Sequence, residues 1–333
     1  MLNMTGIIIM TIGFSFCIVI FGIPILRRAL VSKGIYDNPN ARSSHYLPTP
    51  RGGGIIVMLS IIVGFVTLWW GDVSLPKGLM IALAFACGLG LISWMDDLWR
   101  ISALVRLICQ VMAIGGILYF NPGLATNALP FFPEWSAFLI IPAVWVWCVN
   151  LYNFMDGIDG MTAVETVSIC TGLGLLALTG ILSSDLLPPL AVIGAAALAF
   201  LYWNWSPAKI FLGDVGSIPL GFLLGWFALQ AINDGAWLAA IIIPGYYLAD
   251  ATITLIRRAF RGAPVWQAHR EHFYQMPVPR DVSHNQIMYR IIAINILLIL
   301  TAVWIVPINY WAAFCVSIFF ISILLRNLSQ LGK

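Results

Sequence analysis

The sequence predicts an all-α integral membrane protein, a polytopic helical bundle with about eleven transmembrane helices. Hydrophobic residues make up 61% of the chain and charged residues 9%, whereas about a quarter of the residues are charged in a typical soluble domain. Apolar runs long enough to cross a bilayer also recur along the whole chain. No stretch between them is long enough to fold alone, so residues 1–333 are expected to form a single membrane domain.

Eleven apolar runs are interpreted as spans. The first is followed by Arg27 and Arg28 and has no basic residue before it, which is the reverse of a signal peptide. We therefore expect it to be retained. The spans lie near 5–26, 54–70, 77–95, 102–120, 136–152, 161–182, 188–203, 217–232, 236–256, 286–305 and 308–325.

The distribution of positive charge predicts the orientation. With eleven spans and the N-terminus outside, sixteen of the seventeen Lys and Arg residues fall in or beside cytoplasmic segments, and only Lys77 lies on the other side. This follows the positive-inside rule and places the C-terminus in the cytoplasm. The chemistry is then expected in the cytoplasmic loops, which cover residues 27–54, 93–101, 153–161, 204–217 and 257–285.

The first cytoplasmic loop, 27–54, is basic and rich in Pro, Gly and Asn, so we expect an irregular backbone there. Arg42, His45 and Arg51 supply hydrogen-bond donors for a substrate. The three glycines at 52–54 could bring backbone N–H groups to a phosphate. The alternative is that this loop is only a topology signal or a contact for anionic lipids.

Two adjacent carboxylates, Asp96 and Asp97, follow the third span. They repel one another, so both stay ionised only in water or beside a cation. We therefore expect a metal or a basic partner. The alternatives are a structural ion pair with Arg100 or Arg106, and a helix-capping role for one of the two acids.

The central stretch, 148–165, reads CVNLYNFMDGIDGMTAVE and lies between two apolar runs. Asn153, Asp156 and Asp159 recur every three residues, so on a helix they would share one face and converge on one ligand. Acidic residues at a membrane boundary are costly, which indicates a functional site. A glycine follows each acid and leaves room for a substrate or metal. The alternative is a helix cap with a glycine-rich turn.

Asp214 lies between Gly213 and Gly216 in a turn that is predicted to start a helix. Taken alone, this pattern fits an Asx turn with Ser217 as the helix cap. The functional interpretation is stronger because this is the third acidic turn on the same predicted membrane face.

The late loop, 257–285, contains H-R-E-H-F-Y-Q at 269–275. This run does not match a zinc-protease motif. Arg and His beside Tyr and Gln suit a nucleotide diphosphate, through charge-assisted contacts to phosphate and stacking on a base. Asp250 precedes the loop and is interpreted as structural.

Five motifs in order resemble the polyprenyl-phosphate N-acetylhexosamine-1-phosphate transferases of glycosyltransferase family 4, over nearly the whole chain. They are D-N-P-N-x-R-S-S-H-x-x-P-T-P-R-G-G-G at 37–54, M-D-D at 95–97, N-F-M-D-G-I-D-G at 153–160, F-L-G-D-V-G-S at 211–217 and H-R-E-H-F-Y-Q at 269–275. The resemblance implies transfer of a sugar-1-phosphate from a UDP-N-acetylhexosamine to undecaprenyl phosphate, with release of UMP and with Mg²⁺ as cofactor.

The resemblance also implies roles for single residues. Asp214 would be a magnesium ligand, Asn153 would lie near the metal and the diphosphate, and Asp96 and Asp97 would engage the lipid phosphate. We therefore predict catalytic residues Asp96, Asp97, Asp156 and Asp159, substrate-binding residues Arg42, His45, Arg51, Asn153, His269, Arg270 and His272, and metal ligands Asp214 and Asn153. The expected setting is the bacterial inner (cytoplasmic) membrane with the site facing the cytoplasm. No nucleic-acid partner is expected, and a homodimer is a possible assembly.

The chain departs from the family pattern in two places. The family's late motif often runs D-R-x-H-x-H-H, whereas His269 replaces the Asp here, and Tyr274 and Gln275 stand where the last two His would be. Arg106 stands where many members carry Lys, and a guanidinium fork is not equivalent to a point charge. The His-rich motif of the peptidoglycan-precursor branch is absent, so the chain resembles more closely the branch that starts O-antigen or related surface polysaccharides.

Two rival interpretations come from other classes of protein. A transporter of an anionic solute usually has its site near the bilayer midplane, on broken helices or inverted repeats, whereas these acids cluster at one interface. A non-catalytic scaffold would not require a series of Asp-containing turns on one face, with glycines beside Asp156, Asp159 and Asp214. For the transferase, a phosphate monoester is mostly ionised at neutral pH, so direct attack by the lipid phosphate is favoured over a covalent phosphoryl intermediate.

Overall fold

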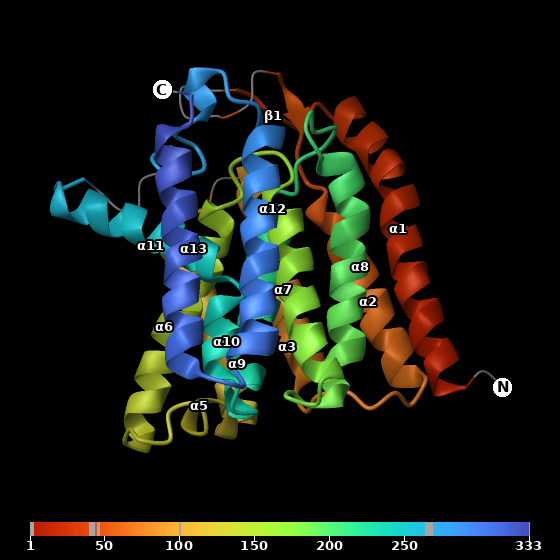
Figure 1. Ribbon diagram of the computed structural model, residues 1–333. Helices are drawn as coiled ribbons and strands as arrows, with labels where there is room; N and C mark the ends of the chain where they lie inside the picture. The colour runs from red at the N-terminus through yellow and green to blue at the C-terminus, as the bar shows by residue number, and fades with distance from the viewer. Residues whose placement is uncertain (1–2, 40–43, 45–46, 100, 264–268, 333) are drawn as a thin grey trace.

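The computed structural model describes residues 3–39, 44, 47–99, 101–263 and 269–332. Their long helices stand side by side in a bundle (Figure 1). These helices are α1 (Met4–Ser32), α2 (Gly54–Trp70), α3 (Leu79–Trp99), α4 (Ala103–Phe120), α6 (Glu134–Phe154), α7 (Met161–Leu178), α8 (Leu187–Asn204), α9 (Asp214–Asn233), α12 (His284–Leu300) and α13 (Tyr310–Gln330). The short helical segments are α5 (Gly123–Thr126), η1 (Ser184–Leu186), η2 (Val278–Arg280) and the π-helical η3 (Thr301–Ile305).

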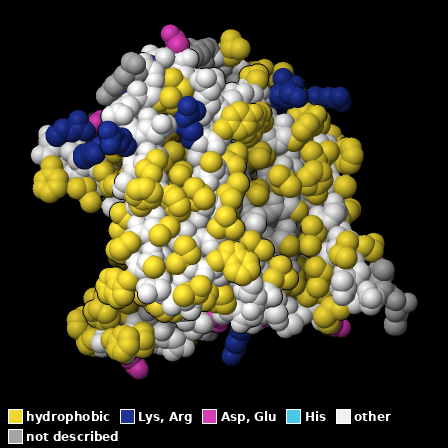
Figure 2. Space-filling view, viewed as in Figure 1, with side chains coloured by type: hydrophobic (Ala, Val, Ile, Leu, Met, Phe, Trp, Pro, Cys, Tyr) yellow, Lys and Arg dark blue, Asp and Glu magenta, His cyan; other side chains and the backbone are white. Residues whose placement is uncertain are grey.

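The surface of the bundle suits a lipid environment. Among the described residues, nine helical segments are long and apolar enough to cross a membrane, and α2 is a shorter apolar helix. Figure 2 shows hydrophobic side chains over the middle of one face, with Lys and Arg gathered towards the upper end. The predicted class, an all-α polytopic membrane protein, is confirmed. The orientation of the bundle in the membrane stays a prediction.

Helices α7 and α9 form the centre of the bundle. In their most apolar windows 72% and 78% of the residues are buried, against 28% or less in α1, α4 and α13. Helix α9 packs on α3 and α6, and its Phe222, Trp226 and Phe227 are fully buried. Because α9 is enclosed by other helices, its first residue, Asp214, is held in a fixed position at one end of the bundle.

The predicted span at 236–256 is corrected by the structure, which has two helices there. They are α10 (Trp237–Ile242) and α11 (Gly245–Phe260), separated by Ile243 and Pro244. Proline lacks the N–H that would continue the helix, and its ring blocks the preceding turn. Helix α11 therefore leaves the bundle axis and projects sideways (Figure 1).

Helix α3 is longer than predicted. It runs to Trp99, so Asp96 and Asp97 lie in its last turn and not in a loop. Neither Gly nor Pro interrupts residues 93–99, so nothing ends the helix before the chain turns towards α4. A helix holds the two carboxylates in fixed directions, which a flexible loop would not do.

Helix α6 ends before the two acids that were expected to lie on it. It ends at Phe154, so Asp156 and Asp159 lie in the turn between α6 and α7 and do not share a helix face with Asn153. The turn ends at Gly160, whose φ of +80° is readily adopted only by glycine. The expected helical arrangement of the three residues is therefore corrected to a turn.

The segment before α2 pairs with the segment before α9. Strands β1 (Tyr36–Asp37) and β2 (Thr49–Pro50) form a short antiparallel ladder, so part of the loop predicted as irregular is ordered. The N–H groups of the glycines at 52–54 donate to the carbonyls of Phe211 and Leu212 at 2.8–3.1 Å. These amides hold two loops together, and the prediction that they approach a phosphate is corrected.

Gly54 and Gly216 allow α2 and α9 to touch through their backbones. A Cβ on Gly54 would lie 2.3 Å from the Cα of Gly216, so Gly54→Ala must push the helices apart. We expect this overpacking to lower the free energy of unfolding by about 1–3 kcal/mol, measured as a lower melting temperature in detergent. In the control, Gly88→Ala, the new methyl group meets nothing within 4 Å. Equal melting temperatures for the two variants would contradict this prediction.

Candidate active site

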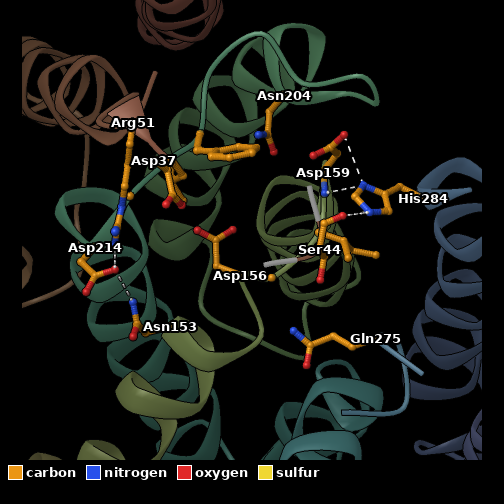
Figure 3. Close-up of a pocket in the computed structure, with 15 residues that line it drawn as sticks. Asp37, Ser44, Arg51, Asn153, Asp156, Asp159, Asn204, Asp214, Gln275 and His284 are labelled. Atoms are coloured by element: carbon orange, nitrogen blue, oxygen red, sulfur yellow. Dashed lines mark hydrogen bonds and ion pairs between the residues drawn. The ribbon is translucent and has the colours of Figure 1, made fainter. Parts of the chain in front are cut away.

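A polar cavity of about 210 Å³ lies at the end of the bundle where α9 begins (Figure 3). Its walls come from the loop before α2, the turn between α6 and α7, the segment before α9 and the segment before α12. Segments far apart in the sequence therefore share one site. The polar residues in its lining are Asp37, Ser44, Arg51, Asn153, Asp156, Asp159, Asn204, Asp214, Gln275 and His284.

Asp214 is the centre of an ion-pair network in this cavity. Its Oδ1 accepts hydrogen bonds from Arg51 Nη2 at 2.5 Å and from Asn153 Nδ2 at 3.1 Å. Burial lowers the pKa of Arg51, but the nearby carboxylates of Asp214 and Asp97 raise it more, and the net shift is upward. Arg51 therefore stays charged and neutralises the acids beside it.

The two acids of α3 have separate arginine partners. Asp97 Oδ1 lies 3.0 Å from Arg51 Nη2, and Asp96 Oδ2 lies 2.8 Å from Arg106 Nη1. The same Arg106 nitrogen is 3.4 Å from Asp214 Oδ2. The ion pair between Asp96 and Arg106 is the structural alternative that the sequence left open, and Arg51 is a second basic partner; together the two arginines join α3 to α9. Arg100, the other partner considered, lies outside the described residues.

These carboxylates fit a magnesium ion. Within the described part of the chain, no group of three or more His, Cys, Asp or Glu side chains has the arrangement of a metal site. Mg²⁺, however, is usually held by one or two carboxylates together with water and substrate phosphates. Asp97 Oδ2 is buried and has no hydrogen-bond partner by distance and angle among the described residues, although the Val215 N–H interacts with this carboxylate; an oxygen that is not saturated by donors suits a cation. Asp97 and Asp214 would hold the ion, and a ligand role for Asn153 stays a prediction.

Asp156 occupies the middle of the cavity wall. Thr162 Oγ1 donates a hydrogen bond to Asp156 Oδ1 at 2.6 Å. Burial raises the pKa of Asp156 to about 6, although Thr162 and the charge of Arg51 act in the opposite direction. Near neutral pH the ionised form of Asp156 therefore lowers the free energy of unfolding.

Asp156→Asn is expected to stabilise the protein at high pH while lowering its activity. The folded-state pKa lies above the ordinary value, so ionisation costs stability; the cost is absent below a pH of about 4 and is complete above about 6. We expect a melting temperature a few degrees above the wild type at pH 8, and a smaller gain at pH 5. Thermal unfolding at both pH values measures this, with Asp185→Asn as control. A gain that does not depend on pH would contradict the prediction.

Asp159 is held by groups from two other segments. Its Oδ2 accepts a hydrogen bond from the Ala208 N–H at 3.1 Å and lies 3.3 Å from His284 Nδ1. Burial raises the pKa of Asp159, but the hydrogen bond and charge of His284, together with hydrogen bonds from Ser206 and Ala208, lower it more, and the net shift is downward. Its carboxylate is thus engaged within the protein. The predicted catalytic role of Asp159 stays a prediction.

The late loop reaches the cavity through a residue that the prediction did not select. Gln275 lines the cavity, and its Oε1 is buried without a partner among the described residues. The predicted residues lie elsewhere. His272 is buried beside Asp250, His269 stacks on His272 with ring centroids 4.8 Å apart, and Arg270 is exposed. Their role in substrate binding stays a prediction.

Asp250 holds the late loop in place. Its carboxylate accepts hydrogen bonds from the N–H groups of Phe273 at 2.9 Å and Tyr274 at 3.2 Å. Tyr274 Oη in turn donates to the Phe154 carbonyl at 3.2 Å, beside the turn that bears Asp156. This arrangement agrees with the structural interpretation of Asp250.

Two predicted residues, Arg42 and His45, lie outside the described residues. The prediction also omitted His284 and Gln275. Gln275 was visible as a departure from the family motif. His284 follows Ser283, which caps α12 by accepting from the Gln286 N–H at 3.3 Å; a lone His at a helix start is a weak signal.

A second cavity, of about 180 Å³, adjoins the first beside Asn153. It lies between α3, α4, α6 and α9 and combines apolar walls with a few polar groups, among them Arg106. Gln110 and Asn150 also line it and donate amide N–H groups to one another at 3.4 and 2.7 Å. A charged head group at Arg106 could therefore be followed by an apolar chain.

The fold and the site define a class: a polytopic membrane protein that joins carboxylates and arginines in a polar cavity at one end of its helices. The model for "Glycosyl transferase family 4" matches residues 79–232, which include α3, α6 and α9. Relatives also match most of the chain, one of them at 30% identity over 77% of this chain's length. The chain belongs to glycosyl transferase family 4.

Three relatives illustrate the similarity. The chain is 28% identical to the "Probable undecaprenyl-phosphate N-acetylglucosaminyl 1-phosphate transferase" of Bacillus subtilis (strain 168), over 91% of this chain and 85% of the relative. It is 30% identical to the "Phospho-N-acetylmuramoyl-pentapeptide-transferase" of Geobacter sp. (strain M21), over 77% and 79%. It is 28% identical to the "Decaprenyl-phosphate N-acetylglucosaminephosphotransferase" of Mycobacterium tuberculosis (strain H37Rv), over 78% and 73%.

Proposed function

We propose that this protein transfers N-acetylhexosamine-1-phosphate from a UDP-sugar to undecaprenyl phosphate, releases UMP, and so starts the synthesis of O-antigen or another surface polysaccharide. The observation that carries the proposal is the joining of Asp96, Asp97 and Asp214 by two arginines, between a polar cavity and a more apolar one. The names of the relatives from Bacillus subtilis and Mycobacterium tuberculosis support N-acetylglucosamine as the first donor sugar to test.

In the proposed reaction an oxygen of the lipid phosphate attacks the phosphorus of the sugar-1-phosphate. A new phosphoanhydride bond forms, the bond to the UMP oxygen breaks, and the leaving UMP takes the electron pair. Because one phosphoanhydride replaces another, the protein mainly has to position two anions and neutralise their charge. Arg51 faces the cavity that would take the donor, and Arg106 faces the cavity that would take the acceptor.

The cofactor proposed for this site is Mg²⁺. When bound, it would neutralise charge on the diphosphate. The buried Asp97 oxygen that is not saturated by donors and the carboxylate of Asp214 support this assignment. Asp96 pairs with Arg106 and would hold that guanidinium towards the lipid phosphate.

UMP release by the purified protein tests the proposal. The assay contains undecaprenyl phosphate and a panel of UDP-N-acetylhexosamines, with and without magnesium. We expect magnesium-dependent release with one donor, together with a lipid diphosphate-sugar product identified by mass spectrometry. Folded protein that releases no UMP with any donor would overturn the proposal and return attention to transport of an anionic solute.

A further inference from the structure

His284, the first residue of α12, connects segments that are distant in the sequence. Its Nε2 lies 3.0 Å from the carbonyl of Ser44, 240 residues earlier, and its Nδ1 lies 3.3 Å from Asp159 Oδ2. The Asp159 N–H also points to the same Nδ1 at 3.4 Å. Figure 3 shows the ring between Asp159 and Ser44, on the opposite side of the cavity from Arg51 and Asp214.

The partners determine where the imidazole carries its protons. A carbonyl oxygen only accepts, so Nε2 must donate to Ser44 in the neutral and in the charged ring. Nδ1 then faces two groups of Asp159: it accepts from the backbone N–H when neutral and donates to the carboxylate when charged. Both states keep His284 attached to the same two segments.

These two segments both contribute to the cavity wall. Ser44 belongs to the loop that carries Asp37 and Arg51, and Asp159 belongs to the turn that carries Asp156. The start of α12 is held in place, because Ile287 and Met288, in the turn after His284, are fully buried. His284 therefore fixes the distance between the loop and the turn.

The imidazole ring of His284 also lies between two cavities. A larger cavity, of about 670 Å³, lies on its other side, and Ser44, Asp159 and His284 line both cavities. Loss of the side chain would open one cavity into the other and would leave the Asp159 carboxylate with its hydrogen bonds from the Ala208 N–H and the Ser206 side chain, both from the segment after α8.

We propose that His284 is a positioning residue for the donor: it holds the Asp156–Asp159 turn and the Arg51 loop in the arrangement that binds the UDP-sugar. This inference rests on the proposed function. His284 acts through its neighbours, and neither His284 nor its partners Ser44 and Asp159 line the acceptor cavity at Arg106. Its loss should therefore affect the two substrates unequally.

His284→Ala tests the inference in the purified full-length protein. We expect the KM for the UDP-sugar and the Kd for UDP, measured by calorimetry, to rise between about ten-fold and a hundred-fold, because a displacement of about 1 Å in the groups that position a substrate has an effect of this size. The KM for undecaprenyl phosphate should stay close to that of the wild type, and the melting temperature should fall by no more than a few degrees. Gln286→Ala, an exposed position on the same turn of α12, is the matched control and should change none of these values.

Two conservative variants separate a positioning role from a merely structural one. His284→Gln can still donate to the Ser44 carbonyl, and His284→Asn keeps a polar group beside Asp159. Each should recover part of the donor affinity that His284→Ala loses. Equal loss of affinity for both substrates together with a lower melting temperature, or wild-type affinity in all three variants, would overturn the inference. A wild-type protein that binds UDP but catalyses no transfer would count against the proposed function alone, because the UDP measurements still test His284.

Discussion

Asp214→Asn is expected to reduce UMP release by about a thousand-fold or more, the scale seen when charge stabilisation is removed from a phosphoryl-transfer site. Asp214 carries the charge shared by Arg51 and Arg106. The Asn side chain keeps the shape but presents no negative charge, and its amide N–H group would compete with the donors around it. Both arginines lose a common partner, and a magnesium ion would lose a carboxylate ligand.

The matched control for Asp214→Asn is Asp234→Asn at the other end of α9. Asp234 caps the helix and accepts from the Ser183 N–H at 2.9 Å, so the same chemical change is made far from the cavity. We expect nearly full activity in the control and a melting temperature within a few degrees of the wild type in both variants. Turnover by Asp214→Asn within ten-fold of the wild type, at saturating magnesium, would contradict its proposed role.

The membrane class could be predicted because it depends only on the mean hydropathy of each apolar run, which is read directly from the sequence. Mean hydropathy does not show where a helix breaks. The apolar run continues on both sides of Pro244, so residues 236–256 were predicted as one span although α10 and α11 are separate helices. A spacing of three also fits a helix and a turn equally well. At residues 153–160 the glycines favour a turn, so the predicted helix face does not form. Asn153, Asp156 and Asp159 nevertheless all line one cavity.

Contacts between distant segments could not be predicted in the same way. The pairing of the 52–54 glycines with Phe211 and Leu212 joins two motifs about 160 residues apart. The glycine motif alone suggested that its N–H groups bind a phosphate. The link from Ser44 to His284 depends on how α12 docks. Sequence patterns indicated which residues carry chemistry, and packing determined which of them meet.

Asp97→Asn is expected to abolish formation of the lipid product, with a loss of about a thousand-fold or more. Asp97 lies 3.0 Å from Arg51 and presents the buried oxygen that is not saturated by donors. An amide there would remove a charge from the proposed magnesium site. Asp72→Asn, in the exposed turn after α2, is the control and should retain full activity.

An isotope-exchange measurement separates direct attack from a covalent step. Wild-type protein, freed of lipid and checked for residual undecaprenyl phosphate, is incubated with UDP-sugar, magnesium and labelled UMP. If the lipid phosphate attacks directly, no label enters the UDP-sugar until acceptor is added, because no phosphoryl group leaves the donor without it. Exchange in the absence of acceptor, lost in Asp97→Asn or Asp156→Asn, would instead identify an aspartate that carries the sugar-1-phosphate. We expect no exchange, because a lipid phosphate that is already ionised at neutral pH needs no activation by a covalent intermediate.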